Sequence, residues 1–115
     1  MAPNRRIGER VFVGLSQLTW SPVPNRDADT RYVFLMDLSV TGAGVYGPTH
    51  PEVHIDDRVV VGFNDSRAVV SVRCVSPTDV SELRYYRVEF VLMEPGFEHD
   101  VYDVIGRARE RRPRR

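Results

Sequence analysis

The 115-residue sequence contains no lysine, a single cysteine and no long hydrophobic run. The lone cysteine, Cys74, excludes an internal disulfide and a cluster of thiolate metal ligands, which fits a reducing compartment. No run approaches the roughly 18 apolar residues of a transmembrane helix. No apolar stretch of the kind found in a secretory signal precedes the first strand-like segment. We therefore expect a single domain in the cytoplasm, without a membrane span.

Because lysine is absent, all 16 basic residues are arginines. The formal net charge is zero, but residues 1–26 carry four arginines against one acid and residues 107–115 carry six against one, so the middle of the chain has eight excess acidic charges. Composition bias explains the missing lysine best, yet every arginine offers a planar fork suited to phosphates and guanine edges. We interpret the arginine-rich tail as a solvated helix end, with contact to an acidic protein, nucleic acid or anionic lipid as the alternative.

Six short segments have the composition or the alternation of β-strands, and turn signals separate them. Alternation is clearest over residues 68–75, and prolines after Trp20 end the first segment because they cannot donate to a ladder. The predicted strands are 10–20, 31–37, 41–46, 58–63, 68–75 and 85–92.

After residue 96 the apolar period changes from two to that of an amphipathic helix. The apolar residues on its shared face are Phe97, Val101, Val104, Ile105 and Ala108. Evenly spaced strands followed by one helix predict an all-β fold with a C-terminal helix, namely a six-stranded antiparallel β-barrel. We assign residues 1–10 to an N-terminal segment, 11–94 to the barrel, and 95–115 to the helix and the arginine-rich tail.

A D-x-S-x-x-G pattern at residues 37–42 follows the apolar run 32–36 and places a carboxylate, a hydroxyl and a glycine in one turn. The Asp37 carboxylate can accept both N–H groups on the Watson–Crick edge of a guanine, and Ser39 can bond a phosphate or a base edge. Gly42 permits a positive φ or the close approach of a ligand. Taken alone, the pattern is more often an Asx turn that closes a hairpin.

Two arginines, Arg6 and Arg10, lie four residues apart before the first strand. Such a pair near a terminus is usually solvated, and Gly8 between them disfavours a stable helix. In an extended segment the two guanidinium groups can instead bracket a ligand. If the first two strands pair, Arg10 at the start of one and Asp37 at the end of the other meet at one end of the barrel.

Together, R-x-x-x-R and D-x-S-x-x-G resemble the motifs of the PilZ domain family, a group of bacterial receptors for the second messenger cyclic di-GMP. The resemblance spans essentially the whole chain and implies a PilZ-like barrel. By this resemblance the arginines would contact phosphates and guanine edges, the carboxylate and the hydroxyl would hold a guanine, and the glycine would leave room for it. The implied ligand-binding residues are Arg6, Arg10, Asp37, Ser39 and Gly42, with Arg5 as a further candidate.

Three positions depart from the family pattern. Asp56 and Arg87 stand where the family often has glycine, and we expect both to lie away from the two motifs. Ile7 stands where a second arginine is frequent, which would weaken affinity or change the number of stacked ligand molecules.

The remaining reactive residues are interpreted as structural. The three histidines, His50, His54 and His99, have no metal-ligand spacing, and no catalytic set is apparent, so we expect no metal, no cofactor and no enzyme activity. Cys74 alternates with polar residues and is predicted to be a core residue. Trp20 is predicted to plug one end of the barrel.

The predicted function is a cyclic di-GMP receptor that changes conformation on binding and signals to an unidentified protein partner. Residues 1–10 would be mobile without ligand and fold over the barrel with it. One alternative is a PilZ-like protein–protein adaptor that binds no nucleotide. The other is a small barrel that binds single-stranded nucleic acid, which the acidic middle and the few aromatics expected on the surface disfavour. We expect a monomer or a weak homodimer.

Overall fold

Six strands and one helix form the part of the chain that the computed structural model describes, which is residues 10–22, 30–50 and 52–110. The strands are β1 (Val11–Pro22), β2 (Arg31–Leu38), β3 (Gly42–Pro48), β4 (Arg58–Phe63), β5 (Ser66–Pro77) and β6 (Leu83–Met93), and the helix is α2 (Pro95–Glu110). The predicted all-β fold with a C-terminal helix is confirmed. The observed strands extend beyond most of the predicted bounds, and β1 includes Pro22.

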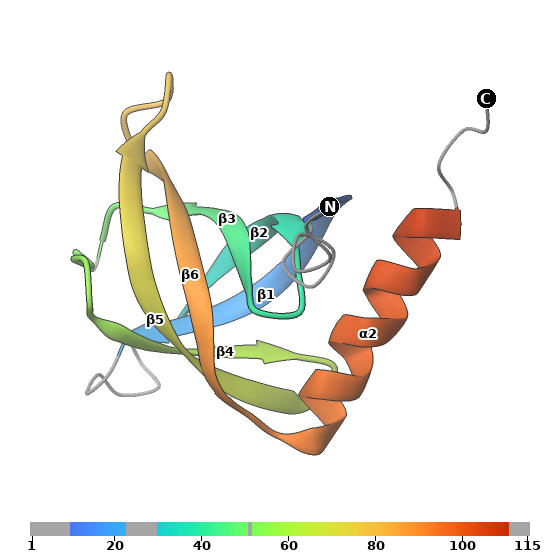
Figure 1. Cartoon of the computed structure of the whole chain (residues 1–115). Coiled ribbons are helices and arrows are strands. Elements are labelled where there is room, and N and C mark those ends of the chain that lie inside the picture. Colours follow the sequence, from blue (N-terminus) through green and yellow to red (C-terminus); the bar gives the residue numbers. More distant parts are fainter. Residues whose placement is uncertain (1–9, 23–29, 51, 111–115) are drawn as a thin grey trace, which may run out of the picture.

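The strands close into an antiparallel barrel in the order β1-β2-β3-β6-β5-β4 (Figure 1). Consecutive strands pair from β1 to β3 and from β4 to β6. The two halves are joined where β3 pairs with β6 and where β1 pairs with β4. The β1–β4 contact that closes the barrel covers four residues of β1, Thr19 to Pro22.

Inward-facing aliphatic side chains fill the barrel around two large rings. Trp20 and Tyr86 are fully buried, with their ring centroids 5.1 Å apart. The Tyr86 hydroxyl donates a hydrogen bond to the Pro48 carbonyl oxygen at 2.8 Å, which satisfies its polar end. Apolar burial around these rings is the main source of stability for the fold.

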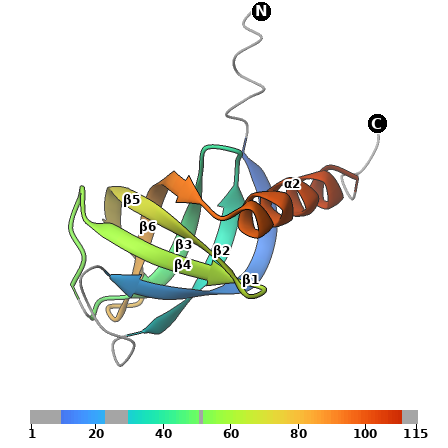
Figure 2. The ribbon, with the colours of Figure 1, turned by 90° about the horizontal axis from the view of Figure 1, so that it is seen from below.

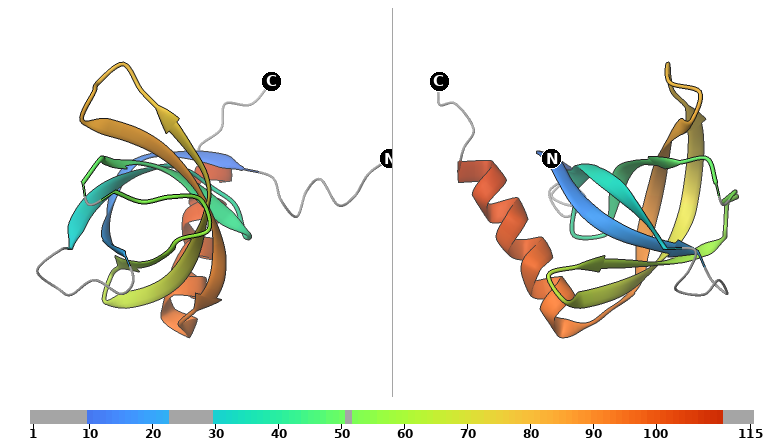
Figure 3. Two further views of the ribbon diagram at one scale, coloured as in Figure 1. Left: turned by 90° about the vertical axis from the view of Figure 1, so that its left-hand side faces the viewer. Right: turned by 180° about the vertical axis from the view of Figure 1, so that it is seen from behind.

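Helix α2 continues from β6 and lies against one end of the barrel, as Figure 2 and Figure 3 show from three sides. Phe97, Val101 and Ile105 are buried on the face that the apolar period predicted. Phe97 packs edge-on against Phe90 at a centroid distance of 5.7 Å. No helix in the described part of the chain is both long and apolar enough to cross a bilayer.

Cys74 lies exposed on the outer face of β5, so the prediction that it belongs to the core is wrong. Ala68, Val70 and Val72 point inwards with the expected period of two. The register with β6 then shifts between Val72 and Cys74, and this irregularity reverses the alternation. Sequence alternation alone does not reveal an extra residue inside a strand.

We predict opposite effects for two glycine-to-alanine substitutions. A Cβ at Gly42 would overlap the backbone carbonyl of Val88, so Gly42→Ala should destabilise the protein by about 1–3 kcal/mol. A Cβ at Gly106, within α2, meets nothing within 4 Å, so Gly106→Ala should stabilise it by about 0.5–1 kcal/mol. Urea unfolding measures both, and a Gly42→Ala protein as stable as the parent would contradict the packing described.

Candidate functional site

Pairing of β1 with β2 brings the two sequence motifs together. Val11 lies opposite Leu38 and Phe12 opposite Asp37. Arg10, just before β1, consequently forms an ion pair with Asp37, with Nε 3.8 Å from Oδ1. The meeting of these two residues at one end of the barrel was predicted from the sequence. The other predicted arginines, Arg5 and Arg6, lie outside the described residues.

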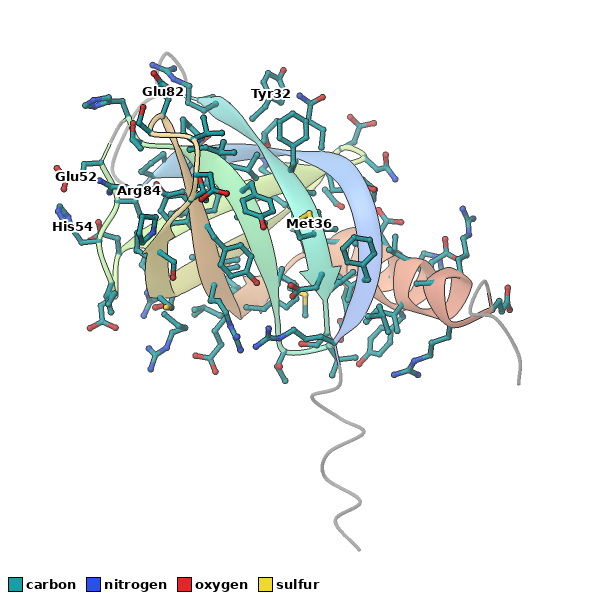
Figure 4. The ribbon with its side chains drawn as sticks, turned by 90° about the horizontal axis from the view of Figure 1, so that it is seen from above. Tyr32, Met36, Glu52, His54, Glu82 and Arg84 are labelled. Carbon is teal, nitrogen blue, oxygen red and sulfur yellow. The ribbon has the colours of Figure 1, made fainter. Side chains whose placement is uncertain are left out.

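Asp37 faces outwards because β2 contains an extra residue. Leu35 and Leu38 are both buried in the core, although side chains three positions apart in a regular strand point to opposite faces. The register with β3 shifts between Leu35 and Asp37, which makes Met36 the residue of a β-bulge (labelled in Figure 4). Without the bulge, the alternation would turn the Asp37 carboxylate into the apolar core.

The two oxygens of the Asp37 carboxylate have different surroundings. Oδ2 accepts a hydrogen bond from the Tyr85 hydroxyl at 3.0 Å. Oδ1 is closed off from solvent and has no hydrogen-bond donor among the described residues. The Arg10 Nε at 3.8 Å is too distant for a hydrogen bond. A buried acceptor without a donor is costly, and Oδ1 is the oxygen of this carboxylate that can still accept a hydrogen bond.

Tyr85 is a neutral donor to this carboxylate at physiological pH. Burial, its hydrogen bond to Asp37 and the negative charge of that carboxylate raise the pKa of Tyr85 from 10.0 to about 12. The hydroxyl reaches Asp37 across Gly44, where an added Cβ would overlap it and lie 2.7 Å from Oδ2. Tyr85 and Gly44 were not predicted as site residues, because their relation to Asp37 depends on β3 lying between β2 and β6.

The Ser39 hydroxyl is buried and used inside the β2–β3 turn. Its Oγ accepts hydrogen bonds from the backbone N–H groups of Thr41 and Gly42 at 3.3 and 3.2 Å. The Ser39 N–H also donates to the Gly42 carbonyl oxygen at 2.9 Å. Through these contacts the D-x-S-x-x-G segment closes the β2–β3 hairpin, which is one of the two interpretations that the sequence allowed.

Gly42 is a buried residue of β3 beside β6, and its backbone is not in the left-handed conformation, so the first of its two predicted roles, a positive φ, does not apply. The absent side chain makes room for the carbonyl group of Val88 on β6. Gly42 therefore has a structural role in strand packing, whatever else it contacts.

A polar hollow lies beside this turn on the outer face of the barrel. Its cavity volume is about 290 Å³. This volume lies close to the lower end of the roughly 300–1,000 Å³ of small-molecule sites. The residues that line it are Arg10, Ser39, Thr41, Gly42, Ala43, Arg73, Arg87, Val88 and Glu89.

Three arginines and one acid give the hollow an excess of positive charge. Arg73 forms ion pairs with Asp56 at 3.4 Å and with Glu89 at 3.8 Å. The Arg87 side chain forms no hydrogen bond or ion pair within the described part of the chain. The expectation that Arg87 lies away from the motifs is therefore wrong. The sequence feature that could have identified Arg87 as a site residue is its charged side chain at a position where the family often has glycine.

Two solved structures are similar to this chain. The Bacillus subtilis inhibitor of motility, MotI/DgrA, aligns with a TM-score of 0.68 and 16% identity over 95% of this chain and 54% of that one. The PilZ domain with c-di-GMP of YcgR from Escherichia coli aligns with a TM-score of 0.65 and 18% identity over 92% of each chain. The chain has a PilZ-like fold.

The chain spans about half the length of MotI/DgrA. No protein-family model matches the sequence, and no curated protein matches it. Asp56 is one of the positions at which this sequence departs from the family pattern. Its φ is 75°, in the region that favours glycine, which accounts for the glycine that is frequent there.

The outer face of this PilZ-like barrel carries more exposed aromatic rings than the sequence suggested. Phe12 is 71% exposed, Tyr32 59% and Phe34 41%, all on β1 and β2. Figure 4 shows Tyr32 towards the start of β2, at the opposite end from the Asp37 turn. The expectation of few exposed aromatics is wrong, because outward-facing strand positions on this side are not polar.

We predict that Tyr85 titrates near pH 12 and that Asp37→Asn lowers its pKa, because the substitution removes the negative charge that favours the neutral phenol and leaves at most a weaker, uncharged acceptor. Burial, the largest cause, remains, so the value should stay above that of a free tyrosine. The folded-state pKa lies above the unfolded value of about 10. The stability linked to Tyr85 is therefore complete below pH 10 and is lost as the pH rises towards 12. Carbon NMR titration of the tyrosine rings measures this, and equal Tyr85 curves in both proteins would refute it.

Proposed function

We propose that the chain is a member of the PilZ family and a receptor for cyclic di-GMP. The observation that carries the proposal is the meeting of Arg10, which lines the arginine-rich hollow, with Asp37, whose Oδ1 has no donor among the described residues. The PilZ domain of YcgR has a similar fold, and its solved structure is one with c-di-GMP. The ligand has two phosphates and two guanines, and arginine forks match both groups.

The proposed contacts divide between the two motifs. Arg10, together with Arg6 and with Arg5 as a further candidate, contacts the phosphates and the acceptor edges of guanine. The Asp37 carboxylate accepts N–H groups of a guanine through Oδ1. Ser39 and Gly42 shape the turn beneath the base, in agreement with their buried positions.

Access to Oδ1 requires a change in the site. This oxygen is closed off from solvent, and the Arg10 side chain beside it is 36% exposed. Movement of that side chain, as it exchanges the carboxylate for a phosphate, would open the oxygen to a guanine. We propose that this change is the start of a conformational signal to a protein partner. The chain would thus act as a regulatory binding module in the bacterial cytoplasm, not as an enzyme.

Single-stranded nucleic acid is the second candidate ligand. Exposed Phe12, Tyr32 and Phe34 offer rings on which bases can stack, and the arginines offer phosphate contacts. The aromatics lie along β1 and β2, whereas Arg73 and Arg87 lie on β5 and β6, and none of the three aromatics lines the hollow that contains these arginines. A cyclic dinucleotide bound at one end of the barrel fits the arrangement better.

We predict that Arg10→Ala and Asp37→Ala each weaken cyclic di-GMP binding by about tenfold or more, because each removes charge-assisted hydrogen bonds. Arg31→Ala is the matched control. Arg31 is exposed at the other end of β2, opposite Trp20, and bonds only the neighbouring Thr30 carbonyl among the described residues. Titration calorimetry measures all three affinities.

The same titrations decide between the candidates. Binding of cyclic di-GMP, but not of GTP or a short oligonucleotide, supports the receptor function. Salt-sensitive binding of the oligonucleotide alone would replace it with the second candidate. No binding of any of these ligands would leave the nucleotide-free adaptor as the remaining function.

We also predict that Arg87→Ala weakens cyclic di-GMP binding and makes the affinity less sensitive to salt. Arg87 lines the hollow and has no acidic partner in the described part of the chain, so its charge is available to a phosphate. Calorimetry at two ionic strengths measures the effect, since screening weakens exposed charge contacts. An unchanged affinity and salt dependence would remove Arg87 from the site.

A further inference from the structure

Asp37 and Arg10 are complementary charges that do not complete a hydrogen bond with each other. Nε and Oδ1 are 3.8 Å apart, whereas charge-assisted N–H···O bonds are about 2.7–2.9 Å long. Neither side chain is fully buried, with 36% of Arg10 and 20% of Asp37 exposed, although Oδ1 itself is closed off from solvent. The separation of Nε from Oδ1 coincides with a restraint on the other oxygen of the carboxylate.

The Tyr85 hydroxyl supplies that restraint. It donates to Oδ2 at 3.0 Å, on the opposite side of the carboxylate from the oxygen nearest Arg10. The bond crosses the face of β3 at Gly44, which lies opposite Asp37 in the β2–β3 register. Any side chain at position 44 would fill the space in which the two groups meet.

The donor is held in place and stays protonated. The Tyr85 ring packs against that of Tyr46, with centroids 5.3 Å apart. The raised pKa of Tyr85 keeps the phenol neutral throughout the physiological range. The carboxylate is therefore fixed through one oxygen by a neighbour that carries no charge.

We propose that Tyr85 is a positioning residue that holds the Asp37 carboxylate away from Arg10, so that the ion pair stays open and yields to the ligand when the Arg10 side chain moves. Without the hydroxyl, the carboxylate would rotate and close the ion pair, and the two motifs would satisfy each other. Guanine recognition would suffer most, because it depends on the direction of the carboxylate oxygens. This role rests on the proposed function as a cyclic di-GMP receptor.

The test compares Tyr85→Phe with Tyr46→Phe. Both remove one hydroxyl from neighbouring rings, but the Tyr46 hydroxyl makes no hydrogen bond within the described part of the chain. Calorimetry with cyclic di-GMP and with cyclic di-IMP, which lacks the guanine amino group, gives the affinity and the preference for guanine. We expect Tyr85→Phe to weaken cyclic di-GMP binding by about tenfold. It should also reduce the preference over cyclic di-IMP, whereas Tyr46→Phe should leave both within about twofold of the parent.

A second readout needs no ligand. In the free protein, the Arg10 Nε–H resonance should shift downfield and exchange more slowly in Tyr85→Phe, because the ion pair has closed. An unchanged Arg10 resonance overturns the inference, and so does equal weakening of both ligands, which would indicate a merely structural effect. If the parent protein binds no cyclic di-GMP, the receptor function fails, and the Arg10 resonance alone then decides whether Tyr85 separates the pair. Far-ultraviolet circular dichroism and urea unfolding confirm that the variants are folded.

Discussion

A single carboxylate, held outside an apolar barrel between a phenol and a guanidinium group, is the constraint on which the site depends. Asp37 reaches this position because β2 contains one residue more than its partner strand requires. The Tyr85 hydroxyl satisfies one oxygen, and Arg10 lies near the other without bonding it. The arrangement leaves an acceptor and a cation side by side, which is the chemistry needed to bind a polar and anionic ligand.

The turn that follows Asp37 is needed for folding as well as for the site. The Ser39 hydroxyl closes the hairpin, and Gly42 allows β3 to approach β6. Both residues are buried, so their presence in the motif has a sufficient explanation in the fold. The Asp37 side chain contacts Tyr85 and Arg10, neither of which belongs to the apolar core. Of the three motif residues, Asp37 is therefore the one whose side chain contributes least to the packing of the barrel.

The local sequence pattern predicted most of the fold and, within the candidate site, the approach of Arg10 to Asp37. The strands and α2 could be read from periodicity because their apolar faces are regular over six residues or more. The approach of Arg10 to Asp37 followed because consecutive strands usually pair. Cys74, Arg87 and Tyr85 were misplaced or missed for a different reason. Their positions depend on a bulge between β5 and β6 and on the pairing of β3 with β6, which joins residues 35 to 47 positions apart in the chain.

The Met36 bulge also bears on how related chains are compared. A barrel that lacks the additional residue would have to carry its acid one place earlier to keep it on the outside. Aligned without a gap, that acid would fall opposite Met36, and an aliphatic residue would fall opposite Asp37. At the 16% and 18% identity of the similar structures, one such offset is enough to conceal a shared motif from position-by-position scoring. Superposed backbones, in which the bulge is visible, are the better guide to which members of this architecture retain the acid.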